Sequence, residues 1–215
     1  MRDNSMLDVS ALRCLPLDRE KFPQDSRFAP MFDEVQQAFQ DESLLPAFDG
    51  SHVNASQAKL SRTQELRDLL SPEQISALFS SEYITWLSGD ITQDKAPDVL
   101  KYLTQELNID LITPTKMVPN LSKQFLEEQP DEWVLRLYEF LNGQEAALRR
   151  YLDKIPLVRL DDGTHVLARE QGEAKAFLPS TIATGFPSVR RAVCTSTEAL
   201  AFLVSLKITE PDPID

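Results

Sequence analysis

The sequence predicts an α+β protein that is predominantly α-helical: a helical bundle with short β-hairpins, one near residues 45–55 and one near residues 155–178. Three observations support this fold class. Apolar residues recur at helical spacing along most of the chain, and several prolines stand where a first helical turn tolerates them. Asp-Gly pairs follow short apolar segments, and tight hairpin turns need such pairs because they accept positive φ.

Changes in composition divide the chain into three parts. Residues 1–26 are polar and interrupted by prolines, which is typical of an arm or linker. Residues 27–152 are predicted to form a mainly helical domain that opens with a helix and a Pro/Asp-Gly hairpin. Residues 153–215 are predicted to form a small α/β subdomain with a hairpin and a C-terminal helix. Its Pro-rich, acidic ending indicates that this part stops at a domain boundary.

The first helix of the bundle is expected to begin at Pro30 and to end before Leu44. Its acidic residues Asp33 and Glu34 favour the positive end of the helix dipole. Two or three further helices are expected over residues 56–87. One of them begins with Ser71 as the N-cap and Pro72 as the first helical residue.

Prolines also mark the later helices of the predicted bundle. Pro97 opens a helix with a single apolar face, and Pro114 starts a short helix that Pro119 interrupts. The strongest helix signal covers residues 130–141, with an acidic first turn and Gly143 where a left-handed residue is expected. A helix over residues 144–152 completes the bundle.

The pattern changes from helical to extended at Ile155. Residues 157–167 read as a hairpin around the turn Asp161-Asp162-Gly163. Residues 176–178 and 188–194 are candidates for further strands. A last helix, capped by Thr195 or Ser196, precedes the exit at residues 210–213.

One phrase occurs twice and contains both histidines of the protein, His52 and His165. Residues 45–53 resemble residues 155–166, because each has a proline, then Asp-Gly, then Ser or Thr, His and Val. The phrase is either a duplicated binding loop or a reused hairpin. The structural interpretation is favoured, because a metal site needs three or four converging ligands and neither cysteine is near either histidine in the sequence. The repeat therefore suggests a chain built of units.

Composition argues against several classes of partner. The net charge of -12 repels phosphate backbones and anionic lipids, and the pairs Arg149-Arg150 and Arg190-Arg191 do not form a stripe, so no nucleic-acid partner is expected. No apolar run reaches the length of a membrane span and no secretory signal opens the chain, so we expect a cytoplasmic protein without membrane contact. Cys14 and Cys194 are expected to stay unbridged.

The sequence contains no recognisable catalytic, cofactor-binding or metal-binding motif. Its six glycines are too scattered for a phosphate-binding loop, which needs clustered glycines so that the backbone can approach phosphate closely. Nucleophile elbows, His-Glu-x-x-His, Cys-x-x-Cys and calcium loops are absent as well. The chain is therefore predicted not to be an enzyme and to need no cofactor.

Four longer phrases form a distinctive set: EYITWLS at 82–88, QPDEWVLRLYEFL at 129–141, IPLVRLDDGTHV at 155–166 and FPSVRRAVC at 186–194. Together they resemble an interior region of the large sacsin-like proteins, over roughly residues 40–215. Those proteins carry a GHKL-type ATPase domain of the heat-shock-chaperone kind. The resemblance implies that the ATPase domain lies elsewhere, so no ATP-site residue is assigned here. The family phrase near the last helix has glycine where this chain has Lys207.

The leading hypothesis is a non-catalytic, modular interaction or relay segment of a larger sacsin-like protein. Its partners would be other domains of the parent chain or client proteins. Two alternatives stay open: a stand-alone protein-binding adaptor, and a metal-dependent hydrolase centred on His52 or His165.

Overall fold

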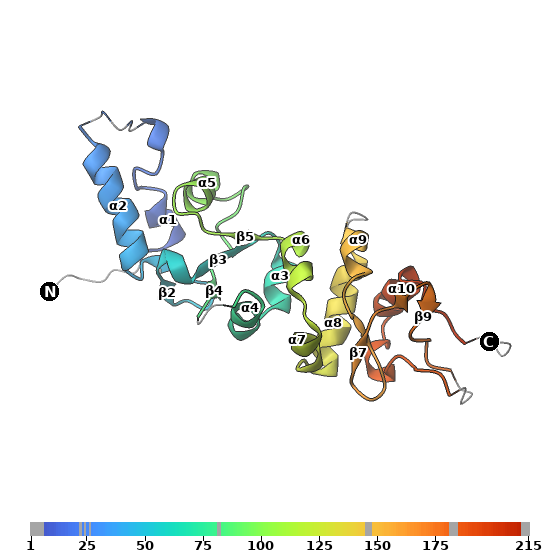
Figure 1. Ribbon diagram of the computed structural model, residues 1–215. Coiled ribbons are helices and arrows are strands. Elements are labelled where there is room, and N and C mark those ends of the chain that lie inside the picture. The colour runs from blue at the N-terminus through green and yellow to red at the C-terminus, as the bar shows by residue number, and fades with distance from the viewer. Residues whose placement is uncertain are drawn as a thin grey trace. The chain divides into compact units, whose positions relative to one another are not determined.

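The computed structural model describes the chain as two compact units, residues 1–113 and residues 114–215 (Figure 1). The predicted α+β class, with helix predominating over strand, is confirmed. The described residues are 7–21, 23, 25, 27–80, 83–144, 148–180 and 185–211. The predicted exit at residues 210–213 lies partly outside them, as does part of the predicted helix at 144–152.

Unit 1 contains five α-helices among its described residues. They are α1 (Val9–Leu12), α2 (Ala29–Asp41), α3 (Gln64–Leu69), α4 (Pro72–Leu78) and α5 (Pro97–Gln105), with short 3₁₀ helices η1 (Arg19–Lys21) and η2 (Ala55–Gln57). Helix α4 begins as predicted, because Ser71 and Gln74 form a capping box ahead of Pro72. Pro97 likewise opens α5.

Two small sheets accompany these helices. The predicted hairpin pairs β1 (Leu45–Pro46) with β2 (His52–Val53) in antiparallel fashion. A parallel sheet, which the sequence did not predict, places β3 (Ala58–Ser61) between β4 (Thr85–Trp86) and β5 (Leu111–Ile112). Part of the expected helical stretch 56–87 is therefore strand. In β3, buried and half-buried residues alternate, as expected for a strand whose side chains point to opposite faces of the sheet.

The core of unit 1 includes two leucines from residues 1–26, the segment that the sequence predicts to be a polar arm. Leu12 and Leu17 are buried in the same cluster as Phe32 and Phe39 of α2. The Tyr102 ring of α5 meets both phenylalanines edge-on, with centroids 5.8 and 6.1 Å away. The segment around α1 thus packs onto the unit, which differs from an extended linker, because its few leucines bury apolar area.

Unit 2 is helical at its start and extended in its middle. Its elements are α6 (Pro114–Met117), η3 (Val118–Asn120), α7 (Lys123–Glu127), α8 (Asp131–Asn142), α9 (Arg149–Leu152), β6 (Val158–Arg159), β7 (His165–Val166), β8 (Arg169–Glu170), β9 (Glu173–Ala174), η5 (Arg191–Val193) and α10 (Thr197–Ser205). The predicted second hairpin is present as β6 paired with β7. Pro119 ends α6 as expected, and Ser196 caps α10.

Helices α8 and α10 form the centre of unit 2. The rings of Tyr138 and Phe202 lie 5.3 Å apart, and both side chains are buried. The predicted boundary between residues 152 and 153 falls inside this compact unit, because α8 before it and α10 after it share one core. The domain limits that the sequence suggests, at residues 26–27 and 152–153, stay a prediction.

Two helix ends depart from a simple pattern. Gly143, expected in a left-handed conformation, has φ −81° and is right-handed, so α8 ends without a left-handed residue at this position. Lys207, where the family phrase has glycine, takes a φ of +63° just after α10. A lysine thus occupies a position that favours glycine.

The hairpins of the two units are built in the same way. In unit 1 Pro46 faces His52, and in unit 2 Arg159 faces His165. The glycine of each turn has positive φ, +85° at Gly50 and +87° at Gly163. In each turn an aspartate accepts hydrogen bonds from the backbone nitrogen and the hydroxyl of the residue two positions later. Asp49 accepts from Ser51 at 2.9 and 2.6 Å, and Asp162 accepts from Thr164 at 2.9 and 2.7 Å. The expected similarity of the two turns is confirmed.

The correspondence extends beyond the repeated phrase to backbone hydrogen bonds. In both units the hairpin and a later segment bond to one another, and a central strand bonds to a segment on each side. The bonds of unit 1 are Phe48 N to Trp86 O, Ser88 N to Pro46 O, Leu87 N to Lys59 O and Leu60 N to Asp110 O. Those of unit 2 are Asp161 N to Ser188 O, Arg190 N to Arg159 O, Val189 N to Phe177 O and Leu178 N to Thr209 O. The two units therefore share one strand framework.

The helix before the last strand segment ends alike in both units. Asn108 follows α5 with a φ of +53°, and Lys207 follows α10 with +63°. The next residue of each is a buried isoleucine, Ile109 or Ile208. The same backbone path thus joins helix to strand in each unit.

Two sequence-based expectations concern the chain as a whole. Cys14 is exposed and Cys194 is buried, and both are free thiols, which confirms that they are not bridged. Among the described residues no helix combines the length and apolar character that crossing a bilayer requires.

Candidate functional site

The two histidines occupy equivalent hairpin positions but have different surroundings. His52 is half-buried, and its Nε2 lies 2.9 Å from the backbone oxygen of Leu7. Its Nδ1 is buried and has no hydrogen-bond partner among the described residues. The ring thus holds the segment that leads into α1 against the first hairpin.

His165 is the more buried of the two, with 1% of its surface exposed. Its Nδ1 lies 3.1 Å from the Pro156 oxygen, and its backbone nitrogen donates to Glu127 at 3.2 Å. Burial first, and the charge of Arg159 second, lower the pKa of His165 to about 4. The imidazole is therefore neutral at neutral pH, beside a surface hollow of about 430 Å³.

The two imidazole rings are the candidate metal ligands of the hydrolase alternative. In the described part of the chain no group of three or more His, Cys, Asp and Glu side chains is placed to hold a metal ion. Each ring instead bonds to a backbone oxygen of its own unit. This geometry is the one expected for a structural hairpin histidine.

An ion-pair cluster around the buried Arg159 ties the second hairpin to α8. Asp131 at the start of α8 lies 2.9 Å from Arg159 Nε and 2.6 Å from Arg190 Nε. Arg159 also donates to the Gln129 oxygen at 2.8 Å. Arg191 donates to the Ser180 oxygen at 2.8 Å, so the pair Arg190-Arg191 makes contacts within its own unit rather than a free basic patch.

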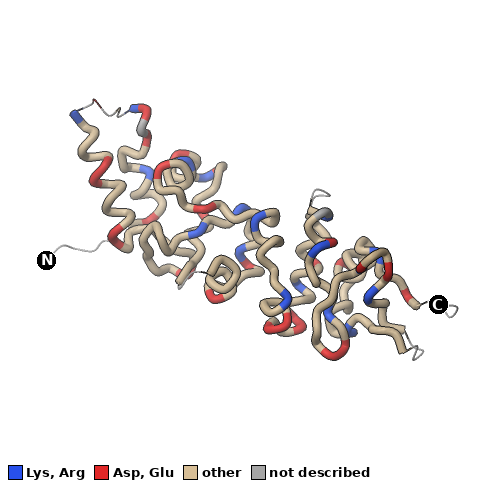
Figure 2. The backbone as a smooth tube through the Cα atoms, in the orientation of Figure 1, with Lys and Arg blue, Asp and Glu red and all other residues tan. Residues whose placement is uncertain are grey.

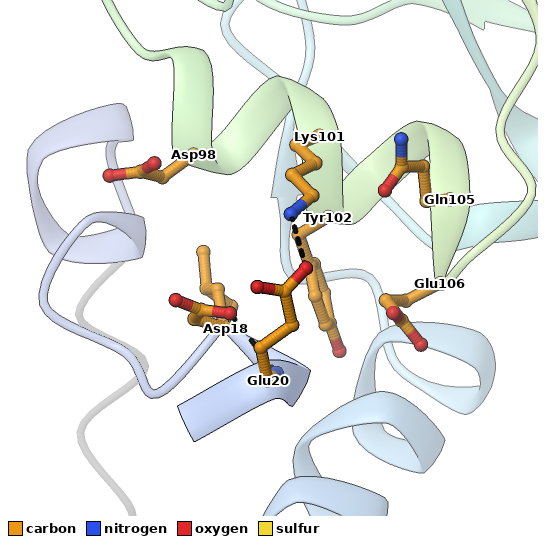
Figure 3. A pocket seen from close by; sticks show the side chains of 8 residues that line it. Asp18, Glu20, Asp98, Lys101, Tyr102, Gln105 and Glu106 are labelled. Carbon is orange, nitrogen blue, oxygen red and sulfur yellow. Dashed lines mark hydrogen bonds and ion pairs between the residues drawn. The ribbon is translucent and has the colours of Figure 1, made fainter. Parts of the chain in front are cut away.

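An acidic hollow of about 100 Å³ lies between the η1 region and α5 (Figure 3). Lys101 reaches Glu20, with its Nζ 3.4 Å from the carboxylate. Tyr102 also lines the hollow, and its buried hydroxyl has no hydrogen-bond partner among the described residues. Burial, aided by the charge of Glu106, raises the pKa of Tyr102 to about 12, so the phenol stays protonated.

A larger pocket of about 580 Å³ lies near the carboxyl ends of β3 and β4 in unit 1, lined by both polar and apolar side chains. Arg67 of α3 borders it, and the Arg67 guanidinium lies over the Phe48 ring with its carbon 4.3 Å from the ring centroid. Gly89 also lies close to the guanidinium, since a Cβ there would stand 2.7 Å from Nη1. Phe48, Arg67 and Gly89 are thus brought together by three separate segments.

Sequence reasoning identified the histidines but missed Arg67. The residue lies in a short helix beside other charged residues, which is ordinary for a solvated face. Only the fold, through β4 and the first hairpin, places Gly89 and Phe48 against it. The one sequence signal was the first Asp-Gly turn, which fixes the position of Phe48 next to it.

Lysines and arginines are mixed with acidic residues along both units, as Figure 2 shows. Comparison of the chain with protein-family models, curated proteins and solved structures found no match.

Proposed function

We propose that the chain is a non-catalytic interaction or relay segment of a larger, sacsin-like protein whose ATPase domain is a separate part. Its partners are other domains of the parent chain or client proteins, in the cytoplasm. The observation that supports this proposal most directly is the duplicated strand framework, which pairs the same backbone groups in both units. Chains built of repeated units commonly act as scaffolds that present surface to partners.

Exposed apolar side chains in both units provide surface for such contacts. Phe48 and Val204 are each 54% exposed, although single exposed apolar residues are normal in monomers. In unit 2, Leu200 and Val204 stand one turn apart on α10 and so share a face. This face is the part of unit 2 that we expect a partner to cover.

The isolated chain is expected neither to bind ATP with micromolar affinity nor to hydrolyse it, because it lacks a glycine-rich phosphate loop. Isothermal titration calorimetry with Mg-ATP and a phosphate-release assay measure the two properties. A known GHKL ATPase serves as the positive control. Micromolar binding, or turnover above the buffer blank, would contradict the non-catalytic role.

The reading frame that encodes this chain is expected to encode a GHKL-type ATPase domain as well. Full-length transcript sequencing tests this, and the ATPase rate of the parent protein is then compared with and without residues 1–215. A changed rate supports a relay role. A reading frame without an ATPase domain would contradict the proposal and leave the stand-alone adaptor.

A further inference from the structure

The Arg67 side chain is held in place by neighbours that do not neutralise it. The Phe48 ring supports one face of the guanidinium, and an arginine over an aromatic ring is attracted by the ring's negative face. Gly89 leaves room for the guanidinium, because any Cβ would overlap it. The contacts fix where the charge lies while leaving its polar edge unused.

No described residue forms a hydrogen bond or ion pair with this guanidinium. Its Nε is buried and has no partner, and a buried donor without a partner is costly. Asp90, whose pKa the charge of Arg67 helps to lower, is bonded instead to Lys95 at 2.6 Å. A group that can accept two hydrogen bonds would satisfy Arg67.

Among the charged side chains of the pocket that Arg67 borders, positive ones outnumber negative ones. Arg62, Arg67 and Lys95 line it, against one acid, Asp94. With Lys95 paired to Asp90, Arg62 and Arg67 stand against Asp94, which is still an excess of positive charge in a chain of net charge -12. The rest of the wall is mixed: hydroxyl and amide side chains (Ser61, Thr63, Gln64, Thr92 and Gln93) stand beside Gly89 and the apolar Ile91, Leu100 and Leu111.

The position of the pocket also fits a ligand site. Ser61 ends β3, and Gly89 follows β4, so the pocket lies where two neighbouring parallel strands end. Ligands of open parallel sheets bind outside these carboxyl ends, since the loops there can diverge around a group.

We propose that this pocket binds an anionic group, a carboxylate or a phosphate, through paired hydrogen bonds from the Arg67 guanidinium. Arginine presents two parallel donors that match the oxygens of either group. Arg62 lies on the rim and adds attraction. The proposal stands on unit 1 alone and does not depend on the parent protein proposed above.

The test is a titration of the full chain followed by NMR, observing the Arg67 Nε–H signal and the Gly89 amide. One arm uses sodium phosphate. The other uses a diglutamate peptide with an acetylated N-terminus and an amidated C-terminus. Both titrations are run at constant ionic strength. A saturable shift in either arm is expected, with a dissociation constant on the order of 1 mM for a single anionic group. The tighter arm identifies the source as free phosphate or an acidic protein segment.

Three variants separate a built site from general electrostatics. Arg67→Gln is expected to weaken binding roughly tenfold or more, as loss of a paired, charge-assisted contact predicts. Gly89→Ala keeps the net charge but displaces the guanidinium, so it should weaken binding too, and as a small substitution it should leave the fold intact. Arg13→Gln removes the same charge at an exposed residue outside the pocket and should leave binding unchanged.

Three results would overturn the proposal. One is the absence of a saturable shift at Arg67 and Gly89 in both arms. A second is an equal loss of binding in Arg67→Gln and Arg13→Gln, which would show that net charge alone attracts the anion. Retained binding in Gly89→Ala, with Arg67 shown to be displaced, would count against it in the same way.

Discussion

The Asp131→Asn variant is expected to lower the free energy of unfolding by about 3 kcal/mol, the lower end of the range for breaking a buried ion pair. Asp131 neutralises Arg159, which is 8% exposed, and also contacts Arg190. Asparagine keeps the volume but removes the charge, so a buried guanidinium loses its counterion. Urea unfolding followed by circular dichroism measures the loss as a lower transition midpoint.

Asp153→Asn is the matched control, because Asp153 is exposed at the end of α9. Its effect should stay within about 0.5 kcal/mol, as for ordinary surface substitutions. Arg190→Gln should cost less than Asp131→Asn, since Arg190 is more exposed and Asp131 keeps Arg159. Equal stability of the Asp131 and Asp153 variants would show that the cluster contributes nothing.

The helices could be predicted because their signals are local. Ser71 and Pro72 start α4 through a capping box that involves only neighbouring residues. Pro97 and Pro119 act in the same way, by fixing φ and removing a donor. Such signals need no knowledge of the rest of the chain.

The parallel sheet could not be predicted, because its strands are short and distant in sequence. β3 pairs with β4 on one edge and with β5 on the other, across intervening helices. Strands of two to four residues carry too little alternation to be told from helix by periodicity. These segments become strands because they form hydrogen bonds with segments that are distant in the sequence.

The duplicated phrase predicted the two hairpins but not the repeated backbone hydrogen bonds beyond them. The two units have the same residue types mainly at the hairpin turn, because the turn needs Asp, Gly and a hydroxyl residue. The remaining framework bonds, such as Leu87 N to Lys59 O and Val189 N to Phe177 O, join backbone atoms and place no demand on side-chain identity. The Arg67 pocket left only the first Asp-Gly turn as a sequence signal, because its residues come from segments that are separate in the sequence.

The stability of the chain is expected to fall by about 3 kcal/mol as pH drops from 7 to 4 because of His165 alone. The folded pKa of this ring is about 4, lowered mainly by burial, against 6.5 for an unperturbed histidine. Between these values the unfolded chain binds the proton and the folded chain does not. The contribution is therefore complete above pH 6.5 and is lost as pH falls toward 4, at about 1.4 kcal/mol per pH unit.

The His165→Gln variant isolates this effect. At pH 7.5 it should be less stable than the parent by about 1 to 2 kcal/mol, because the ring's packing and its bond to Pro156 are lost. At pH 4.5 this deficit should shrink by about 2 kcal/mol, since only the parent must exclude a proton from the buried ring. Carboxylates such as Asp162, whose pKa is lowered by bonds from Thr164, titrate alike in both proteins and cancel in the difference. Denaturant unfolding at both pH values measures the deficit, and a deficit that does not change with pH would mean that His165 is protonated in the folded chain.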